Sequence, residues 1–328
     1  MIITKSPFRI SFVGGGSDLE DYYKFNGGAV LSTTIDKYMY ISSHRYFVKD
    51  HIRLKYSKTE TVDNIDLIEH PIFKEVLTKF NINGALEFSS NADVPSGTGL
   101  GSSSSFTVNL LLNNYARLNQ QVSKHQLAKE ACNIEINRCN DPIGKQDQYA
   151  AAFGGLNIII FKPNGDVVVE PLYIKSATKK TLDDRLMMFY TGEQRSAGDI
   201  LKDQKQQMKQ IEKRQILDHM VQLVWDCRQA LFNDDLQQFG QILHKNWQLK
   251  QQLSAHISNS TINTYYNKAI NAGAVGGKLL GAGESGFLLF YCAKQYQPAV
   301  RAALSDCTEM PFTFENEGAR VIYYADET

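Results

Sequence analysis

The hydrophobic residues in the first half of the chain gather in short β-rich runs, and this pattern predicts strands. Such runs occupy residues 9–13 and 37–44. Two more, at residues 156–161 and 167–172, are joined by a segment that contains Asn164-Gly165, a strong hairpin signal. The first half is therefore expected to be built around a β-sheet with at least one hairpin.

Helical spacing of apolar residues appears between these runs. Residues 127–134 carry apolar side chains every three to four positions, and Ser123 and Gln126 form a capping-box pair in front of them. A second helix is expected over residues 106–118, directly behind a segment rich in glycine and serine.

The second half begins at an expected boundary near residues 173–183, where a polar stretch interrupts the pattern. The elements expected after it are a strand, three helical regions and a last strand, at residues 186–190, 197–252, 261–271, 297–304 and 320–324. Strands and helices alternate irregularly in both halves, which favours an α+β fold over a doubly wound parallel sheet. We expect two domains, residues 1–178 and 179–328.

Composition narrows the class of protein. The 328 residues are 43% hydrophobic, enough for two domains with their own cores. Lys+Arg and Asp+Glu number 35 each, which argues against general nucleic-acid binding. Five cysteines without C-x-x-C spacing suggest free thiols in a reducing compartment. Without a signal-peptide pattern or a run of about 18 apolar residues, we expect a cytoplasmic protein with small-molecule partners, and a homodimer is compatible with the sequence.

The segment that says most about function is the glycine-rich loop at residues 95–105, PSGTGLGSSSS. Its three alternating glycines allow positive φ and close approach to a ligand, and its serines can cap the helix that follows. A helix N-terminus with free N–H groups suits a phosphate. A flexible linker is the alternative, but apolar residues flank the loop on both sides.

Two better-known phosphate loops do not fit this sequence. A P-loop needs Lys and then Ser or Thr after its last glycine, but Ser102 and Ser103 follow Gly101. The pattern G-x-G-x-x-G of dinucleotide-binding proteins does occur at residues 281–286. The apolar run at 287–291 behind it predicts a strand, whereas that fingerprint must open a helix, so an NAD-linked oxidoreductase is disfavoured.

Three glycine-rich motifs in one order resemble those of the GHMP kinases, at residues 9–18, 95–104 and 278–286. The resemblance spans nearly the whole chain and implies a two-domain α+β fold with the active site between the domains. In this superfamily the N-terminal domain is ribosomal protein S5 domain 2-like and the C-terminal domain is ferredoxin-like. The resemblance also implies that ATP binds at the second motif.

Within the superfamily, the chain looks most similar to the heptose 7-phosphate kinase branch. The segments that carry this similarity are GGGSDL, GGAV, IDKY, YSKTE and HP, at residues 14–19, 27–30, 35–38, 56–60 and 70–71. The Gly-Glu-His-Thr-Asp sequence usual in galactokinases is absent, which disfavours galactose. Fucokinase-type members share the triple glycine and remain the nearest rival.

The resemblance assigns roles to individual residues. It implies that Ser103 and Glu135 hold Mg²⁺, which prefers hard oxygen ligands. It implies that Asp147 accepts the proton of the acceptor hydroxyl or positions it, and that Arg9 faces this aspartate. On local grounds alone, Glu135 is equally compatible with a surface helix position, Asp147 with a loop and Arg9 with a strand-end ion pair.

The binding residues follow from the same resemblance. Those expected to hold ATP are Pro95, Gly97, Gly99, Leu100, Gly101, Ser102, Ser103 and Ser104. Those expected to hold the sugar are Gly15, Gly16, Ser17, Asp18 and Gly283. A substrate that already carries a phosphate needs a cation at its far end. Arg195 is the first candidate for that cation, and Lys145 is the second.

The function that the sequence favours is therefore an ATP-dependent sugar 1-kinase. Its expected reaction converts D-glycero-D-manno-heptose 7-phosphate to the 1,7-bisphosphate for nucleotide-activated heptose synthesis. The alternatives are a fucokinase-like or other sugar kinase of the superfamily, and a catalytically silent sugar sensor.

Overall fold

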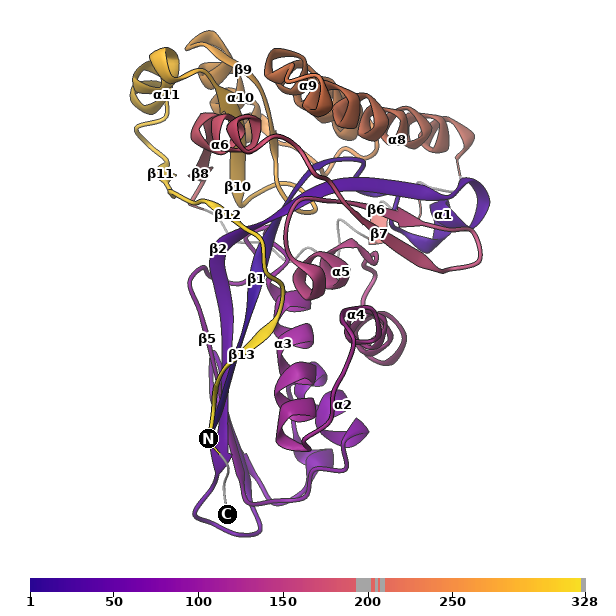
Figure 1. Cartoon of the computed structure of the whole chain (residues 1–328), viewed down its shortest axis with the longest axis vertical. Helices are drawn as coiled ribbons and strands as arrows, with labels where there is room; N and C mark the ends of the chain where they lie inside the picture. The colour runs from indigo at the N-terminus through magenta and orange to yellow at the C-terminus, as the bar shows by residue number, and fades with distance from the viewer. Residues whose placement is uncertain (193–201, 204–205, 207–209, 326–328) are drawn as a thin grey trace.

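A computed structural model describes residues 1–192, 202–203, 206 and 210–325 of the chain. These residues form two β-sheets, each covered by helices, with the larger sheet in the lower part of Figure 1 and the smaller one above it. Three short helical turns complete the structure, η1 (Ile65–Leu67), η2 (Asn133–Arg138) and η3 (Lys294–Tyr296). No helix among the described residues is both long enough and apolar enough to cross a membrane.

The larger sheet has nine strands among the described residues. They are β1 (Ile2–Val13), β2 (Gly28–Arg45), β3 (Ile52–Lys55), β4 (Thr59–Val62), β5 (Leu86–Ala92), β6 (Asn157–Phe161), β7 (Val167–Pro171), β12 (Phe314–Glu315) and β13 (Arg320–Tyr324). The main order is β13-β1-β2-β5-β3-β4, and only β3 and β5 pair in parallel. The long strand β2 pairs with β6 through its first residues and with β5 through its last ones.

Helices of the N-terminal half gather at this sheet, as Figure 1 shows. They are α1 (Glu20–Asn26), α2 (Pro71–Lys79), α3 (Ser102–Arg117), α4 (Lys124–Cys132) and α5 (Gln146–Phe153). Helix α3 is buried along most of its length, and two buried asparagines bind it to strand β2. Asn109 Nδ2 donates to Met39 O at 2.8 Å, and Asn113 Nδ2 donates to Ile41 O at 3.2 Å. Because buried amides need partners, these bonds fix how α3 sits on the sheet.

The smaller sheet is antiparallel, in the order β11-β8-β10-β9. Its strands are β8 (Leu186–Tyr190), β9 (Ala274–Leu279), β10 (Phe287–Cys292) and β11 (Thr308–Glu309). The helices of this part are α6 (Ser176–Arg185), α8 (Ile211–Phe232), α9 (Leu236–Gln251), α10 (Ser260–Asn271) and α11 (Gln297–Ala303). Helix α9 packs on β9 and α8, and both α8 and α9 also contact β1 of the larger sheet.

The last strands return to the larger sheet. Strand β12 pairs with β2, and β13 pairs with β1 from Ile2↔Tyr324 to Lys5↔Arg320. The proposed division at residue 178 thus separates the strands of the two sheets except for these two.

The strands and hairpin expected from the sequence are present as β1, β2, β6 and β7. The expected helical region 197–252 differs, because its described part is broken at residues 233–235. Asp234 has a φ of +60°, and the Asp235 side chain accepts from Gln238 N at 2.9 Å and starts a new helix. The run expected to interrupt the pattern near residue 176 is instead helix α6.

The glycine-rich loop at residues 95–105, called the phosphate loop below after its expected role, touches the third glycine motif, at residues 278–286, through the backbone. A Cβ at Gly99 would lie 2.5 Å from Leu280 O, and a Cβ at Gly281 would overlap Gly99 Cα. A Cβ at Gly286 would likewise lie 2.5 Å from Thr98 O. The glycines at 281–286 therefore serve a close contact between the two sheets' loops, and the next residues form strand β10, as the sequence predicted.

Candidate active site

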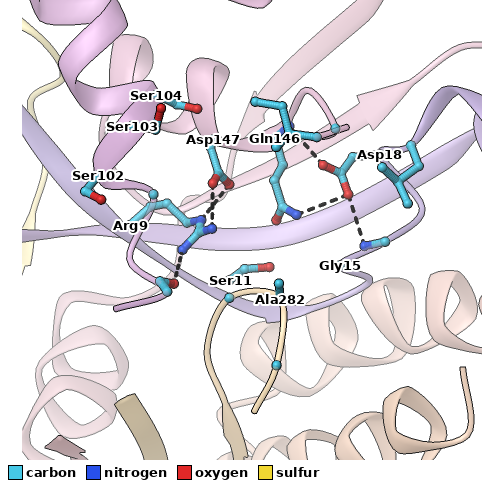
Figure 2. Close-up of a pocket in the computed structure, with 18 of the residues that line it drawn as sticks. Arg9, Ser11, Gly15, Asp18, Ser102, Ser103, Ser104, Gln146, Asp147 and Ala282 are labelled. Atoms are coloured by element: carbon cyan, nitrogen blue, oxygen red, sulfur yellow. Dashed lines mark hydrogen bonds and ion pairs between the residues drawn. The ribbon is translucent and has the colours of Figure 1, made fainter. Parts of the chain in front are cut away.

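A cavity of about 220 Å³ opens where the three glycine-rich motifs, the start of α5 and the end of α9 meet (Figure 2). The structure brings most of the sequence-predicted residues to its wall. Those that line it are Arg9, Gly15, Gly16, Asp18, Gly97, Gly99, Gly101, Ser102, Ser103, Ser104, Asp147 and Gly283.

Five of the predicted residues that the structure describes do not line this cavity, and one of them, Lys145, lines a neighbouring cavity instead. Leu100 is fully buried, and its carbonyl accepts from Arg9 N at 3.1 Å. The Ser17 hydroxyl donates to Ala29 O, Pro95 is exposed at the start of the loop, and Glu135 lies behind Ser103. Arg195, the first candidate for binding a sugar phosphate, lies outside the described residues.

The phosphate loop contributes Gly97, Gly99 and Gly101 to the cavity wall. Gly97, Gly99 and Gly101 have φ values of +75°, +87° and +76°, which favour glycine. Helix α3 begins at Ser102, and its N-cap is Gly101, so no serine side chain caps it as the sequence suggested. The first N–H groups of a helix lack partners within the helix, and those of Ser102 to Ser104 belong to residues on the cavity wall.

Arg9 and Asp147 form a two-pronged ion pair in the middle of the site (Figure 2). Arg9 Nε donates to Asp147 Oδ1 and Nη2 to Oδ2, both at 2.7 Å, while Nη1 donates to Gly99 O at 2.6 Å. Asp147 lies in the first turn of α5 rather than in a loop. Arg9 thus faces Asp147, as the family resemblance implied, and also ties it to the phosphate loop.

Asp18 lies at the end of the cavity away from Ser102 and Arg9 (Figure 2). Its carboxylate accepts from Gly16 N at 3.0 Å and from Gln146 N and Nε2 at 3.2 and 3.1 Å. Burial raises the pKa of Asp18, and the charge of Asp147 raises it further. Gln146 was not among the residues predicted from the sequence. Gln146 and Ser11 both line the cavity, and the Gln146 Oε1 and the Ser11 hydroxyl are buried without a partner among the described residues, so both suit a hydroxyl-rich ligand.

Glu135 is a fully buried carboxylate on the π-helical turn η2 that continues α4. It accepts from Ser103 Oγ at 2.8 Å and from Gln148 Nε2 at 2.7 Å. Burial raises its pKa to about 7 and the charge of Asp147 acts in the same direction, while the hydrogen bonds from Ser103 and Gln148 oppose them. The described residues contain no group of three His, Cys, Asp or Glu side chains that could hold a metal. A hard cation at Glu135 and Ser103 would therefore take its other ligands from water and nucleotide.

Two buried lysines that the sequence reasoning missed also line the cavity, Lys250 on α9 and Lys278 on β9. Burial lowers the pKa of both side chains. A pattern could have pointed to each. Lys250 continues the apolar stripe of α9 through Leu243 and Trp247, and Lys278 sits within an otherwise apolar and glycine-containing strand.

Comparison with known proteins finds matches along the chain. The family model for the GHMP kinases N terminal domain matches residues 66–155, and that for the GHMP kinases C terminal matches residues 227–309. The chain is 31% identical to D-glycero-alpha-D-manno-heptose 7-phosphate kinase of Campylobacter jejuni, over 97% of this chain and 98% of that one. It is 28% identical to the galactokinase of Pyrococcus furiosus, with 87% of each chain covered.

Solved structures give a similar result. The crystal structure of a D-glycero-D-manno-heptose 1-phosphate kinase from Bacteroides thetaiotaomicron matches with a TM-score of 0.82 and 26% identity. The match covers 99% of this chain and 100% of that chain.

The buried Glu135 generates a stability prediction. Its pKa rises from 4.5 to about 7 on folding, so the folded state keeps a proton that the unfolded state releases. Its contribution to the free energy of unfolding should fall as pH rises from about 4.5 to about 7. Glu135→Gln should remove this decline, which is worth at most about 3 kcal/mol. Denaturant unfolding of both proteins at several pH values, without divalent cation, measures it.

The glutamine is a fair substitute because the Gln148 amide can turn over. Gln148 Oε1 has no partner in the structure, so after rotation it can accept from the new amide. Parallel pH dependence in the wild type and the variant would contradict the assigned burial effect.

Proposed function

The chain belongs to the GHMP kinases and is an ATP-dependent sugar kinase, and we propose that it phosphorylates the anomeric hydroxyl of D-glycero-D-manno-heptose 7-phosphate. The product would be the 1,7-bisphosphate, a precursor for nucleotide-activated heptose. The observation that carries the proposal is the Arg9–Asp147 pair between the phosphate loop and the Asp18 end of the cavity. The relative named for the same reaction supports the choice of sugar.

The triphosphate of ATP is proposed to bind at the start of α3. The N–H groups of Ser102 to Ser104 and the partial positive charge of the helix N-terminus suit phosphate oxygens. Gly99 and Gly101 let the loop backbone lie close to its protein neighbours. A Cβ at Gly101, for example, would already lie 3.2 Å from Asp147 Oδ2.

Ser103 and Glu135 are proposed to hold Mg²⁺. Glu135 supplies a buried carboxylate without a cationic partner among the described residues, and Ser103 supplies a hydroxyl at 2.8 Å from it. When bound, the ion would neutralise negative charge on the nucleotide phosphates. Gln148 holds the second carboxylate oxygen and so fixes the orientation of Glu135.

The sugar is proposed to bind beside Asp18. The Asp18 carboxylate can accept hydrogen bonds from sugar hydroxyls while Gly16 N and Gln146 hold it in place. The buried Oε1 of Gln146 and the Ser11 hydroxyl can complete the contacts. Binding there would put the anomeric hydroxyl near Asp147 and the phosphate loop.

In the transfer step, the anomeric oxygen forms a bond to the γ-phosphorus while the bond to ADP breaks and ADP keeps its electron pair. Asp147 accepts the proton that the sugar oxygen loses. Arg9 holds both carboxylate oxygens of Asp147 and is itself held by Gly99 O, so Asp147 keeps one orientation to the phosphate loop. Positioning of this kind supplies much of the catalysis in phosphoryl transfer.

The 7-phosphate needs a separate anchor, and Lys145 is our proposal among the described residues. A second cavity, of about 620 Å³, adjoins the first and shares Asp18, Leu19 and Ile143 with it. Lys145 lines this second cavity, where its Nζ donates to Gly165 O at 2.9 Å and lies over the Tyr23 ring. Arg195 remains a second proposal for this role.

Carboxylates also line the second cavity, but two of them already have partners. Glu130 accepts from the Tyr115 hydroxyl and pairs with Lys79, and Asp166 accepts from the Asn164 amide. Lys145 therefore keeps donors for an anionic ligand.

A substrate panel tests the proposed reaction. ADP release should be fastest with D-glycero-D-manno-heptose 7-phosphate, and kcat/KM should fall at least about tenfold for the heptose without phosphate, because a charge-assisted contact is lost. Galactose and fucose serve as rival substrates in the same assay. Equal turnover of the unphosphorylated heptose would remove the claim about the 7-phosphate, and faster turnover of fucose would favour the fucokinase alternative.

Asp147→Asn tests the proton acceptor. The amide cannot take up the proton, so kcat should fall at least about a hundredfold while ATP still binds. Asp63→Asn, at an exposed position that lines neither cavity, is a matched control for the acid-to-amide change. Rapid turnover by Asp147→Asn would rule out the assigned role.

Lys145→Met tests the phosphate anchor. It should raise KM for the heptose 7-phosphate about tenfold or more and leave KM for the unphosphorylated heptose unchanged, because only the first carries the charge. Steady-state kinetics with both sugars makes the comparison internal to one variant. Equal increases in both KM values would indicate a structural effect and count against the anchor.

A further inference from the structure

Lys250 is a buried cation for which the steps above have no use. It lies in the last turn of α9 with only 6% of its surface exposed, and it lines the cavity. Its Nζ donates to Gly281 O, the acceptor that the described residues provide. A lysine ammonium has three N–H donors, so two remain for a ligand in the cavity.

The position of Lys250 is set by contacts on both sides of the site. Asn246 lies one helical turn earlier on the same face of α9. It accepts from Gly14 N at 3.2 Å and so holds the helix against the first glycine motif, at residues 14–16. Gly281, which accepts from Lys250, packs on Gly99, which accepts from Arg9. Arg9 and Lys250 thus bind the two segments that meet at the contact between Gly99 and Gly281.

The charges around Lys250 place it near the transfer point. The groups that act on it are Arg9 from β1, Asp18 from the loop before α1, Asp147 from α5 and Lys278 from β9. The guanidinium of Arg9 is paired with Asp147 by two bonds, and the Lys278 Nζ donates to Ser11 O and Phe12 O. Lys250 therefore has one more donor left than Lys278, and its ammonium is not bonded to a carboxylate of the described residues, as the Arg9 guanidinium is.

We propose that Lys250 is a further catalytic residue, whose ammonium donates hydrogen bonds to the phosphoryl group as it passes from ATP to the sugar hydroxyl. That group spreads negative charge over three oxygens, and a preorganised donor stabilises it most during transfer. Lys250 keeps its own protons, since the sugar proton goes to Asp147 and ADP leaves with its electron pair. The inference rests on the proposed transfer geometry, but it does not depend on which sugar is the substrate.

The acid–base behaviour of Lys250 supports this role. Burial, together with the positive charge of Arg9, lowers its pKa to about 8, while Asp18 and Asp147 act in the opposite direction. The side chain therefore loses its charge as pH rises through about 8. An arginine at the same position would stay charged there, because its guanidinium titrates only above about pH 12.

The experiment compares Lys250→Met and Lys250→Arg with the wild type, using steady-state ADP release from pH 6.5 to 9.5. Lys250→Met should lower kcat about a hundredfold, the usual cost of losing such a donor, with less than about threefold change in either KM. Lys250→Arg should retain more activity and should not share the fall in kcat/KM that is expected of the wild type above about pH 8, because kcat/KM reports the pKa values of the free enzyme. Lys245→Met, at an exposed lysine of the same helix, is the matched control and should behave like the wild type.

Two results would overturn the proposal. One is a kcat for Lys250→Met within about threefold of the wild type, and the other is a loss confined to KM, which indicates ground-state binding. If Lys250→Met does not fold, as thermal unfolding would reveal, the Arg variant decides, because an unchanged alkaline limb in its pH profile also refutes the role. The assay uses whichever sugar the wild type turns over, so failure of the heptose proposal leaves this test intact.

Discussion

The backbone contact between Gly99 and Gly281 is the constraint on which the rest of the site depends. It joins the loop at residues 95–105 to the third glycine motif, at residues 278–286. The two backbones lie so close that neither glycine could carry a side chain. Arg9 binds the carbonyl on one side of this contact and Lys250 binds the carbonyl on the other. The Arg9–Asp147 ion pair, the loop at residues 95–105 and helix α9 therefore hold a single arrangement only while the two loops touch.

The site also concentrates buried charges, and their environments differ. Asp147 is matched by the fork of Arg9, whereas Glu135 is buried without a cation among the described residues and has a raised pKa. Lys250 is buried among charges of both signs and has a lowered pKa. Groups held in this way cost stability when no ligand is bound, and they are aligned in advance for a ligand that supplies the opposite charge. This arrangement suits a polyanionic nucleotide better than a neutral ligand.

Much of the fold could be read locally. The hairpin around Asn164-Gly165, the cap at Ser123 and the strand at 287–291 depend on neighbouring residues, so their patterns predicted them correctly. The break at Asp234 was missed because the apolar spacing continues on both sides of it. Lys250 was missed because a lysine on a helix normally faces water. Gln146 was missed because nothing near it in sequence marks the Asp18 carboxylate as its partner.

The sequence alone determined that three glycine motifs occur in one order, and so the family, the phosphate loop and the candidate pair Arg9 and Asp147. The conformational freedom of glycine and the free N–H groups of a helix N-terminus are local properties, so the loop could be predicted from its own residues. The pair Arg9 and Asp147 followed from the family resemblance. Only the tertiary structure decided which charges meet, because those contacts join residues as far apart as Arg9 and Asp147, or Lys278 and Ser11. Burial, which sets the pKa values of Glu135 and Lys250, likewise exists only once distant elements pack together.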